Sequence, residues 1–207
     1  MTRPEYDTAT FYLSSWSKHI LRECERRRIT VYDLKRKRAT RNEVESVITS
    51  KNPTFLILNG HGGEKSIYGD ENEPIIDLSN VKLLNKKLIY TIACKAAKKL
   101  GRIAVKNDAK CFIGYEEDFV FIINLRKVSK PLKDEFARPF FVSTNKIPIS
   151  LIKGNSAKES VKRAVNEFRK WIIRVRNYSI PEADWILRGL LWDITFLKLL
   201  GNEKAKI

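Results

Sequence analysis

The chain has 207 residues, is 43% hydrophobic and carries a formal net charge of +16, so it can bury a substantial core beneath a basic surface. No apolar run approaches the ~18 residues of a membrane span, and the first residues lack the apolar segment of a signal peptide. Three cysteines without paired spacing and two histidines argue against a disulfide framework and a structural zinc site. We therefore expect one cytoplasmic domain, residues 1–207, without membrane contact.

The first part of the chain predicts two helices and one strand. Apolar residues recurring every three or four positions indicate a helix over residues 9–28. A strand over residues 29–34 and a basic loop over residues 35–39 follow. Capping-box spacing then opens a helix over residues 40–50.

The next two strands end in chemically informative residues. Residues 54–58 and 88–91 are apolar runs typical of buried parallel strands. The first is followed by Asn-Gly-His-Gly-Gly, which contains His61, and the second by Ile-Ala-Cys-Lys, which contains Cys94. If the strands are neighbours, His61 and Cys94 meet at the carboxyl edge of the sheet, as a cysteine nucleophile and its base require. We expect the surrounding glycines to use positive φ angles.

The remaining elements complete an α/β pattern. We predict a hairpin from residues 66–69 and 74–76, then a helix over residues 97–107 and strands over residues 110–115 and 119–123. Two further helices are expected to begin near residues 156 and 179, and the second of them should end near Gly201. Strands alternating with helices predict a mainly parallel central sheet flanked by helices, followed by a helical C-terminal part.

The histidine among glycines, followed by a strand ending in Ala-Cys, resembles the motif of the caspase-like cysteine peptidases (clan CD). This superfamily includes caspases, gingipains, separase, clostripain and the CHAT domains. Residues 100–105, 108–115 and 152–156 are similar in order to the helix, strand and Gly–Ser segments of CHAT and gingipain-like domains. The resemblance runs from about residue 29 onward and implies a three-layer sandwich.

The resemblance also implies a mechanism. Cys94 would be the nucleophile and His61 the proton carrier of a cysteine endopeptidase that works through an acyl-enzyme and needs no cofactor. The backbone N–H groups of Gly62 and Cys94 would form the oxyanion hole. We expect a helix that begins just after Cys94, with Lys95 and Lys98 nearby, to lower the thiol pKa.

Substrate preference is open at this level. Family members that cut after Arg or Lys place an acidic residue in the pocket that binds this side chain. Glu116, Glu117 and Asp118 could supply such an acid. The alternative is that these three residues form a solvent-exposed turn without a role in substrate binding. We also place Asn59 and Gly63 beside the substrate. The caspase pattern Gln-Ala-Cys-Arg/Gln/Gly-Gly is missing, which weakens any claim of aspartate specificity.

Other residues and the charge have simpler interpretations. Cys24 and Cys111 fit apolar packing, and His19 fits an ordinary helix residue. The expected partners are a protein or peptide substrate and an activating protein. The alternative function is a catalytically silent caspase-like scaffold, or a basic module that binds an acidic protein or nucleic acid. Because the chain lacks a recognition motif, we do not expect sequence-specific nucleic-acid binding.

Overall fold

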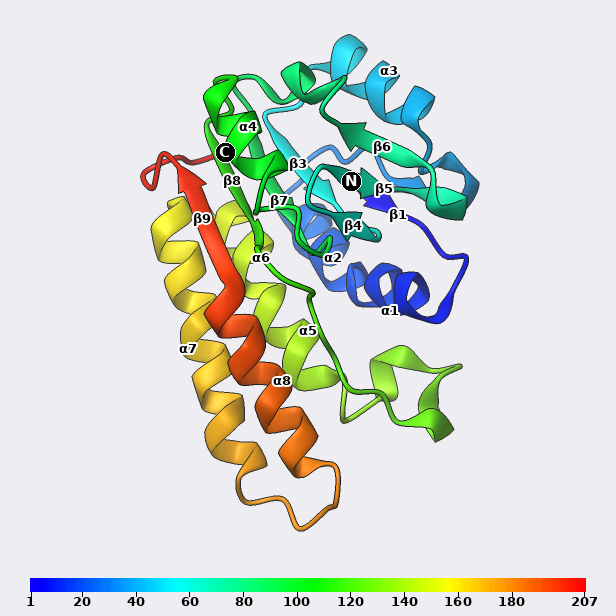
Figure 1. The fold of residues 1–207 in the computed structure, drawn as a ribbon, viewed down its shortest axis with the longest axis vertical. Coiled ribbons are helices and arrows are strands. Elements are labelled where there is room, and N and C mark those ends of the chain that lie inside the picture. Colours follow the sequence, from blue (N-terminus) through cyan, green and yellow to red (C-terminus); the bar gives the residue numbers. More distant parts are fainter.

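The computed structural model describes residues 1–207 and is built around a six-stranded sheet of order β2–β1–β3–β7–β8–β9 (Figure 1). The strands are β1 (Thr2–Arg3), β2 (Leu34–Lys35), β3 (Phe55–Leu58), β7 (Leu88–Thr91), β8 (Cys111–Tyr115) and β9 (Leu197–Gly201). Neighbouring strands are parallel, except that β9 runs antiparallel to β8. A separate antiparallel sheet contains β4 (Gly62–Gly63), β5 (Ser66–Tyr68) and β6 (Pro74–Asp77). The predicted α/β fold with a mainly parallel sheet is confirmed.

Eight α-helices surround these strands. They are α1 (Thr8–Trp16), α2 (Lys18–Arg26), α3 (Arg41–Lys51), α4 (Leu100–Lys106), α5 (Arg138–Thr144), α6 (Lys146–Ile152), α7 (Ala157–Val175) and α8 (Ala183–Phe196). Helices α7 and α8 form a long antiparallel pair that extends away from the sheet, and β9 continues from α8 back along β8 (Figure 1). No helix combines the length and the apolar character needed to cross a bilayer.

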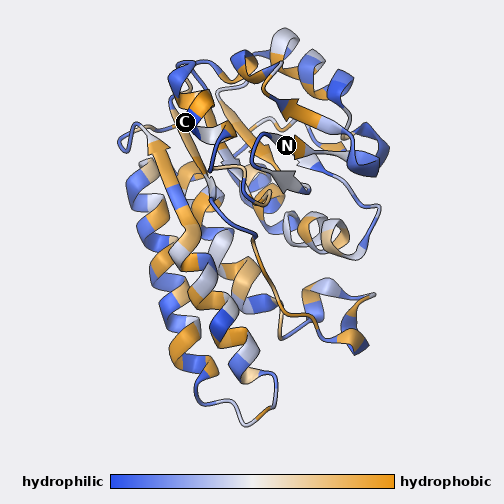
Figure 2. Cartoon of the chain, viewed as in Figure 1, coloured by the Kyte–Doolittle hydropathy of each residue, from blue (hydrophilic) through white to orange (hydrophobic).

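The sheet has a hydrophobic core on each face, because side chains alternate along a strand. Ile57 and Tyr90 belong to a core shared with α1, α2 and α5 to α8. Leu56 and Ile89, their neighbours in sequence, belong to a second core shared with α3, α4 and β6. Figure 2 shows hydrophobic residues concentrated on the central strands and hydrophilic residues on the outer turns of α3 and α7. This arrangement is compatible with a three-layer sandwich.

Elements with strong local signals form where the sequence predicts them. Thr40 caps α3 by accepting a hydrogen bond from the Glu43 amide, and Ser156 caps α7 in the same way through Glu159. Strands β3 and β7, and the hairpin β5–β6, also agree with prediction.

Two N-terminal predictions are wrong. The expected helix over residues 9–28 is divided at Ser17, which ends α1 and begins α2. The Ser17 hydroxyl donates to the Leu13 carbonyl and accepts from Asn59, so tertiary contacts fix the break. The strand expected over residues 29–34 is reduced to Leu34–Lys35, because its partner β1 offers only two residues for pairing.

Two later predictions are also wrong. Residues 119–123 do not form a strand, because the Val120 amide donates to the side chain of buried Asp193 and the edge of β8 is already occupied by β9. The last helix ends at Phe196, and residues that we expected to continue it form β9 instead. Gly201, with a φ of 88°, ends β9 rather than a helix.

Candidate active site at the carboxyl edge of the sheet

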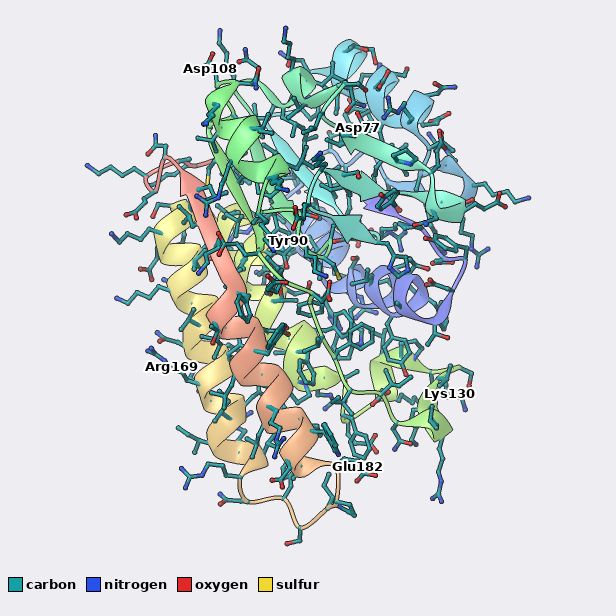
Figure 3. The ribbon with its side chains drawn as sticks, in the orientation of Figure 1. Asp77, Tyr90, Asp108, Lys130, Arg169 and Glu182 are labelled. Carbon is teal, nitrogen blue, oxygen red and sulfur yellow. The ribbon has the colours of Figure 1, made fainter.

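Four polar side chains follow the carboxyl ends of four adjacent parallel strands. Asp7 follows β1, His61 follows β3, Cys94 follows β7 and Asp118 follows β8. Open α/β sheets place their sites at this edge, since parallel strands deliver the residues that follow them to one side. Figure 3 shows Tyr90 of β7, four residues before Cys94, in the middle of the molecule. The adjacency of β3 and β7 confirms the strand pairing on which the predicted dyad depends, with Leu58 opposite Thr91.

The backbone beside His61 lies directly against the backbone of Cys94. A Cβ atom added to Gly62 would lie 2.5 Å from the Cys94 carbonyl oxygen and 2.7 Å from its amide nitrogen. No side chain fits in that space, so glycine is required at this position for steric reasons. We expected positive φ angles at Gly60, Gly62 and Gly63, but only Gly60, at 152°, adopts one.

His61 is held by a carboxylate that sequence reasoning missed. Its Nε2 atom lies 2.6 Å from Oδ2 of Asp7, and the Tyr6 ring lies beside the imidazole. With Nε2 donating to Asp7, the neutral tautomer leaves Nδ1 as the free base. Asp7 also caps α1, accepting from the Thr10 amide. A capping Asp carries a sequence signal, but nothing in the sequence links it to a histidine 54 positions away.

Electrostatics keep the Asp7 carboxylate charged. Burial acts to raise the pKa of Asp7, but hydrogen bonds from Thr10 and His61 outweigh burial and leave the pKa below its usual range. A charged Asp7 would stabilise an imidazolium at His61, as an orienting carboxylate does in a nucleophile–base–acid arrangement.

The Cys94 thiol is half-buried and strongly favours its protonated form. Burial raises the pKa of Cys94 to about 11; the nearby Phe119 amide opposes this shift, and the Asp118 carboxylate adds to it. Asp118 also forms an ion pair with Lys95 at 3.2 Å. The expectation of a lowered thiol pKa is therefore wrong for this arrangement of the loop.

The helix expected to activate Cys94 begins too late to do so. Helix α4 starts at Leu100, not at residue 97, and the intervening turn is fastened to the segment after β8. The Lys95 amide donates to the Glu117 carbonyl at 3.2 Å, with Lys95 in the left-handed region at a φ of 59°. The Leu100 amide donates to the Glu64 carbonyl. Since the helix field falls off within the first turn, α4 leaves Cys94 largely unaffected.

Both backbone donors predicted for an oxyanion hole are free of partners. The Cys94 amide donates no hydrogen bond within the protein. The Tyr68 amide donates to the His61 carbonyl, so these two residues form the hydrogen-bonded pair of the β4–β5 ladder. Antiparallel ladders alternate, which makes Gly62 opposite Ile67 a non-hydrogen-bonded pair and points the Gly62 amide away from β5. Gly63 is half-buried in β4.

The five residues assigned to substrate binding have different environments. Asn59 is fully buried and donates to Ser17, so it positions the start of α2 and offers no surface to a substrate. Glu116 pairs with Arg102 at 2.6 Å, and Glu117 pairs with Lys98 at 3.3 Å. Of these three acids, only Asp118 acts on the Cys94 thiol.

The remaining candidates lie apart from the site. Cys24 and Cys111 are both buried, and burial raises the pKa of Cys111 to about 12. His19 lies on α2 with its ring near Trp16. No group of three or more His, Cys, Asp or Glu side chains is arranged to hold a metal ion. The chain matches no known protein-family model and no curated protein sequence.

Proposed function

We propose that the protein is a caspase-like cysteine peptidase in which Asp7, His61 and Cys94 act in series. The observation that carries the proposal is the junction of β3 and β7. There, the residue after a carboxylate-bound histidine packs against the backbone of the only cysteine that is not fully buried. A nucleophile, a base and an acid that orients the base are the parts needed for acyl transfer.

The proposed reaction begins with proton transfer from the Cys94 thiol to Nδ1 of His61. The sulfur attacks the peptide carbonyl, and the amides of Gly62 and Cys94 stabilise the oxyanion. His61 then returns the proton to the departing amine as the C–N bond breaks, which leaves a thioester. Water attacks the thioester with His61 as base, and the Cys94 thiol is released with the carboxylic acid.

If the protein is a peptidase, the raised thiol pKa describes its resting state. With a pKa of about 11, Cys94 is a neutral thiol at pH 7, and the turn after it is tied to the segment that carries Asp118. Thiolates, not thiols, are the attacking species. A substrate or an activating protein that displaces Asp118 would remove one cause of the raised pKa and favour catalysis.

The same observation favours the second candidate function, a catalytically silent scaffold. A scaffold does not need a reactive thiol, and the net charge of +16 suits an acidic protein partner. In this case the His61–Asp7 pair would serve only to fasten the segment after β3 to the start of α1. The two functions differ in a single measurable property, Cys94-dependent turnover.

The test is peptide cleavage by the full chain and four variants. Substrates are fluorogenic peptides with Arg, Lys or Asp before the reporter, together with an unbiased peptide pool, over pH 6 to 10. Cys94→Ala and His61→Ala should each lower turnover by about a thousandfold or more, and the double variant should be scarcely worse than either, because residues that act as one unit are not additive. His19→Ala is the matched control and should leave turnover unchanged.

Two outcomes contradict the proposal. Equal cleavage by the wild type and Cys94→Ala would show that the peptidase activity does not depend on this site. Absence of cleavage from every peptide at every pH, with a folded wild type, would favour the silent scaffold.

A further inference from the structure

A polar groove between α6 and α7 shares no residue with the candidate active site. It has a volume of about 260 Å³, and Ile149 is its only hydrophobic lining residue. Its polar lining consists of Lys146, Ser150, Lys153, Asn155, Arg163, Asn166, Glu167 and Lys170. On α7, residues 163, 166, 167 and 170 have the spacing that places them on one helix face, so their side chains converge on the groove.

The groove carries more positive charge than its own acids can neutralise. Four cations face one carboxylate, Glu167, whose contact with Lys146 is long at 3.9 Å. Arg163 is paired outside the groove with Glu159 at 3.1 Å. Lys153 and Lys170 have no ion pair. Like charges held together repel one another, and a bound anion relieves that repulsion.

Ser150 provides a second, independent indication of a ligand. Its side chain is 4% exposed and lines the groove, yet its hydroxyl has no hydrogen-bond partner. Ser160 on α7 is unpaired as well, whereas two other buried serines donate to the carbonyl four residues earlier: Ser17 to Leu13 at 2.7 Å and Ser143 to Pro139 at 2.6 Å. Ser150 does not form this bond. A buried hydroxyl without a partner is costly, so an oxygen acceptor at this position would be stabilised.

The donors favour one class of ligand. The groove offers ammonium, guanidinium, amide and hydroxyl donors from three sides: α6, the turn at residues 153–155, and α7. A phosphate group presents several charged acceptor oxygens in a compact volume, whereas a single carboxylate presents two. Glu23 is bound by Arg26 and Arg27, and the charge of Lys153 also helps to hold the pKa of Glu23 below its usual range, although Glu23 and Lys153 form no ion pair.

We propose that this groove binds a compact phosphate-bearing anion such as an inorganic or nucleoside polyphosphate. The Ser150 hydroxyl donates to a phosphate oxygen, and Lys153 and Lys170 supply most of the charge. The buried position of Ser150 favours a compact ligand over a nucleic-acid backbone, whose phosphates would remain on the surface. The proposal is independent of peptidase activity.

The test is calorimetric titration of the full chain with tripolyphosphate, ATP, inorganic phosphate and a single-stranded oligonucleotide at matched ionic strength. The variant carries Lys153→Gln and Lys170→Gln. The matched control carries Lys162→Gln and Arg169→Gln, which remove the same charge from exposed, unpaired positions outside the groove; Figure 3 shows Arg169 at the outer side of α7. We expect one tripolyphosphate per chain, binding at least tenfold weaker in the groove variant and less than twofold weaker in the control. Similar binding of ATP would assign the site to nucleotides, and tripolyphosphate alone would assign it to inorganic anions.

Ser150→Ala separates a ligand contact from a structural role. Without ligand, the variant should melt at a higher temperature because an unpaired buried hydroxyl is removed, and it should bind tripolyphosphate several-fold more weakly. Ser160→Ala is the control, since the Ser160 hydroxyl is also buried and unpaired but lies outside the groove. Equal loss of binding in the two double variants would overturn the proposal in favour of diffuse attraction. Tighter binding of the oligonucleotide than of tripolyphosphate would overturn it in favour of a nucleic-acid surface.

Discussion

Asp118 should be the main removable barrier to Cys94 reactivity. With the pKa of Cys94 at about 11, about 0.1% of the thiol is ionised at pH 8. An ordinary cysteine with a pKa of about 8.5 would be about one quarter ionised at the same pH. Alkylation of Cys94 by iodoacetamide should therefore be about 200-fold slower than that of an unperturbed thiol, yet faster than that of Cys24 or Cys111, which are buried.

Asp118→Asn removes a carboxylate beside the thiol and releases Lys95 from its ion pair. Both changes favour the thiolate, so Cys94 should be alkylated about fivefold faster at pH 8. A fivefold change corresponds to about 1 kcal/mol, the interaction energy of two unit charges about 4 Å apart in water. The assay is peptide mass spectrometry of native protein sampled during alkylation between pH 7 and 10. Glu117→Gln is the matched control, because it removes the neighbouring acid, which is paired with Lys98 instead. An unchanged or slower rate in Asp118→Asn, or equal acceleration in both variants, would refute the reasoning.

Three further predictions test the surroundings of the site. Asp7→Asn keeps a good helix cap but loses the charge that supports His61, so any peptidase turnover should fall about a hundredfold or more with little change in melting temperature; an unchanged rate would remove Asp7 from the mechanism. Gly62→Ala should cost about 1–3 kcal/mol in urea unfolding, because its Cβ would meet the Cys94 backbone, whereas Gly63→Ala, with 3.9 Å to its nearest atom, should be nearly neutral. Asp193 is buried with its pKa well above 3.8, so the contribution of this one residue to stability is fully present below about pH 3.8 and declines as pH rises toward its folded-state pKa. Relative to the wild type, Asp193→Asn should gain stability between pH 4 and pH 7 in urea titrations, and parallel pH profiles would contradict this assignment.

Local signals in the sequence were sufficient for several elements. Thr40 and Ser156 cap their helices through the amide three residues later, a contact that needs no tertiary structure. The apolar runs before His61 and Cys94 form adjacent parallel strands, since a strand buried on both faces has a composition of its own. The edge of the sheet that carries the candidate site could therefore be predicted, together with its two central residues.

Other predictions failed where distant packing decides. Residues 119–123 have strand-like composition, but the side chain of Asp193 takes the Val120 amide. Residues 197–201 have helix-like composition, but the open edge of β8 pairs with them as β9. Propensity is a weak preference, and it yields to hydrogen bonds offered by segments far away in the sequence.

The sequence by itself determined that a histidine and a cysteine follow two buried strands, because strand composition and the glycines between them are local properties. Only the tertiary structure decided that Asp7 holds His61 and that Asp118 faces Cys94, because β1 and β8 carry these carboxylates to the same edge. Only the tertiary structure decided the state of the thiol. Its pKa depends mainly on burial and on groups from other segments, which outweigh the opposing charge of the adjacent Lys95.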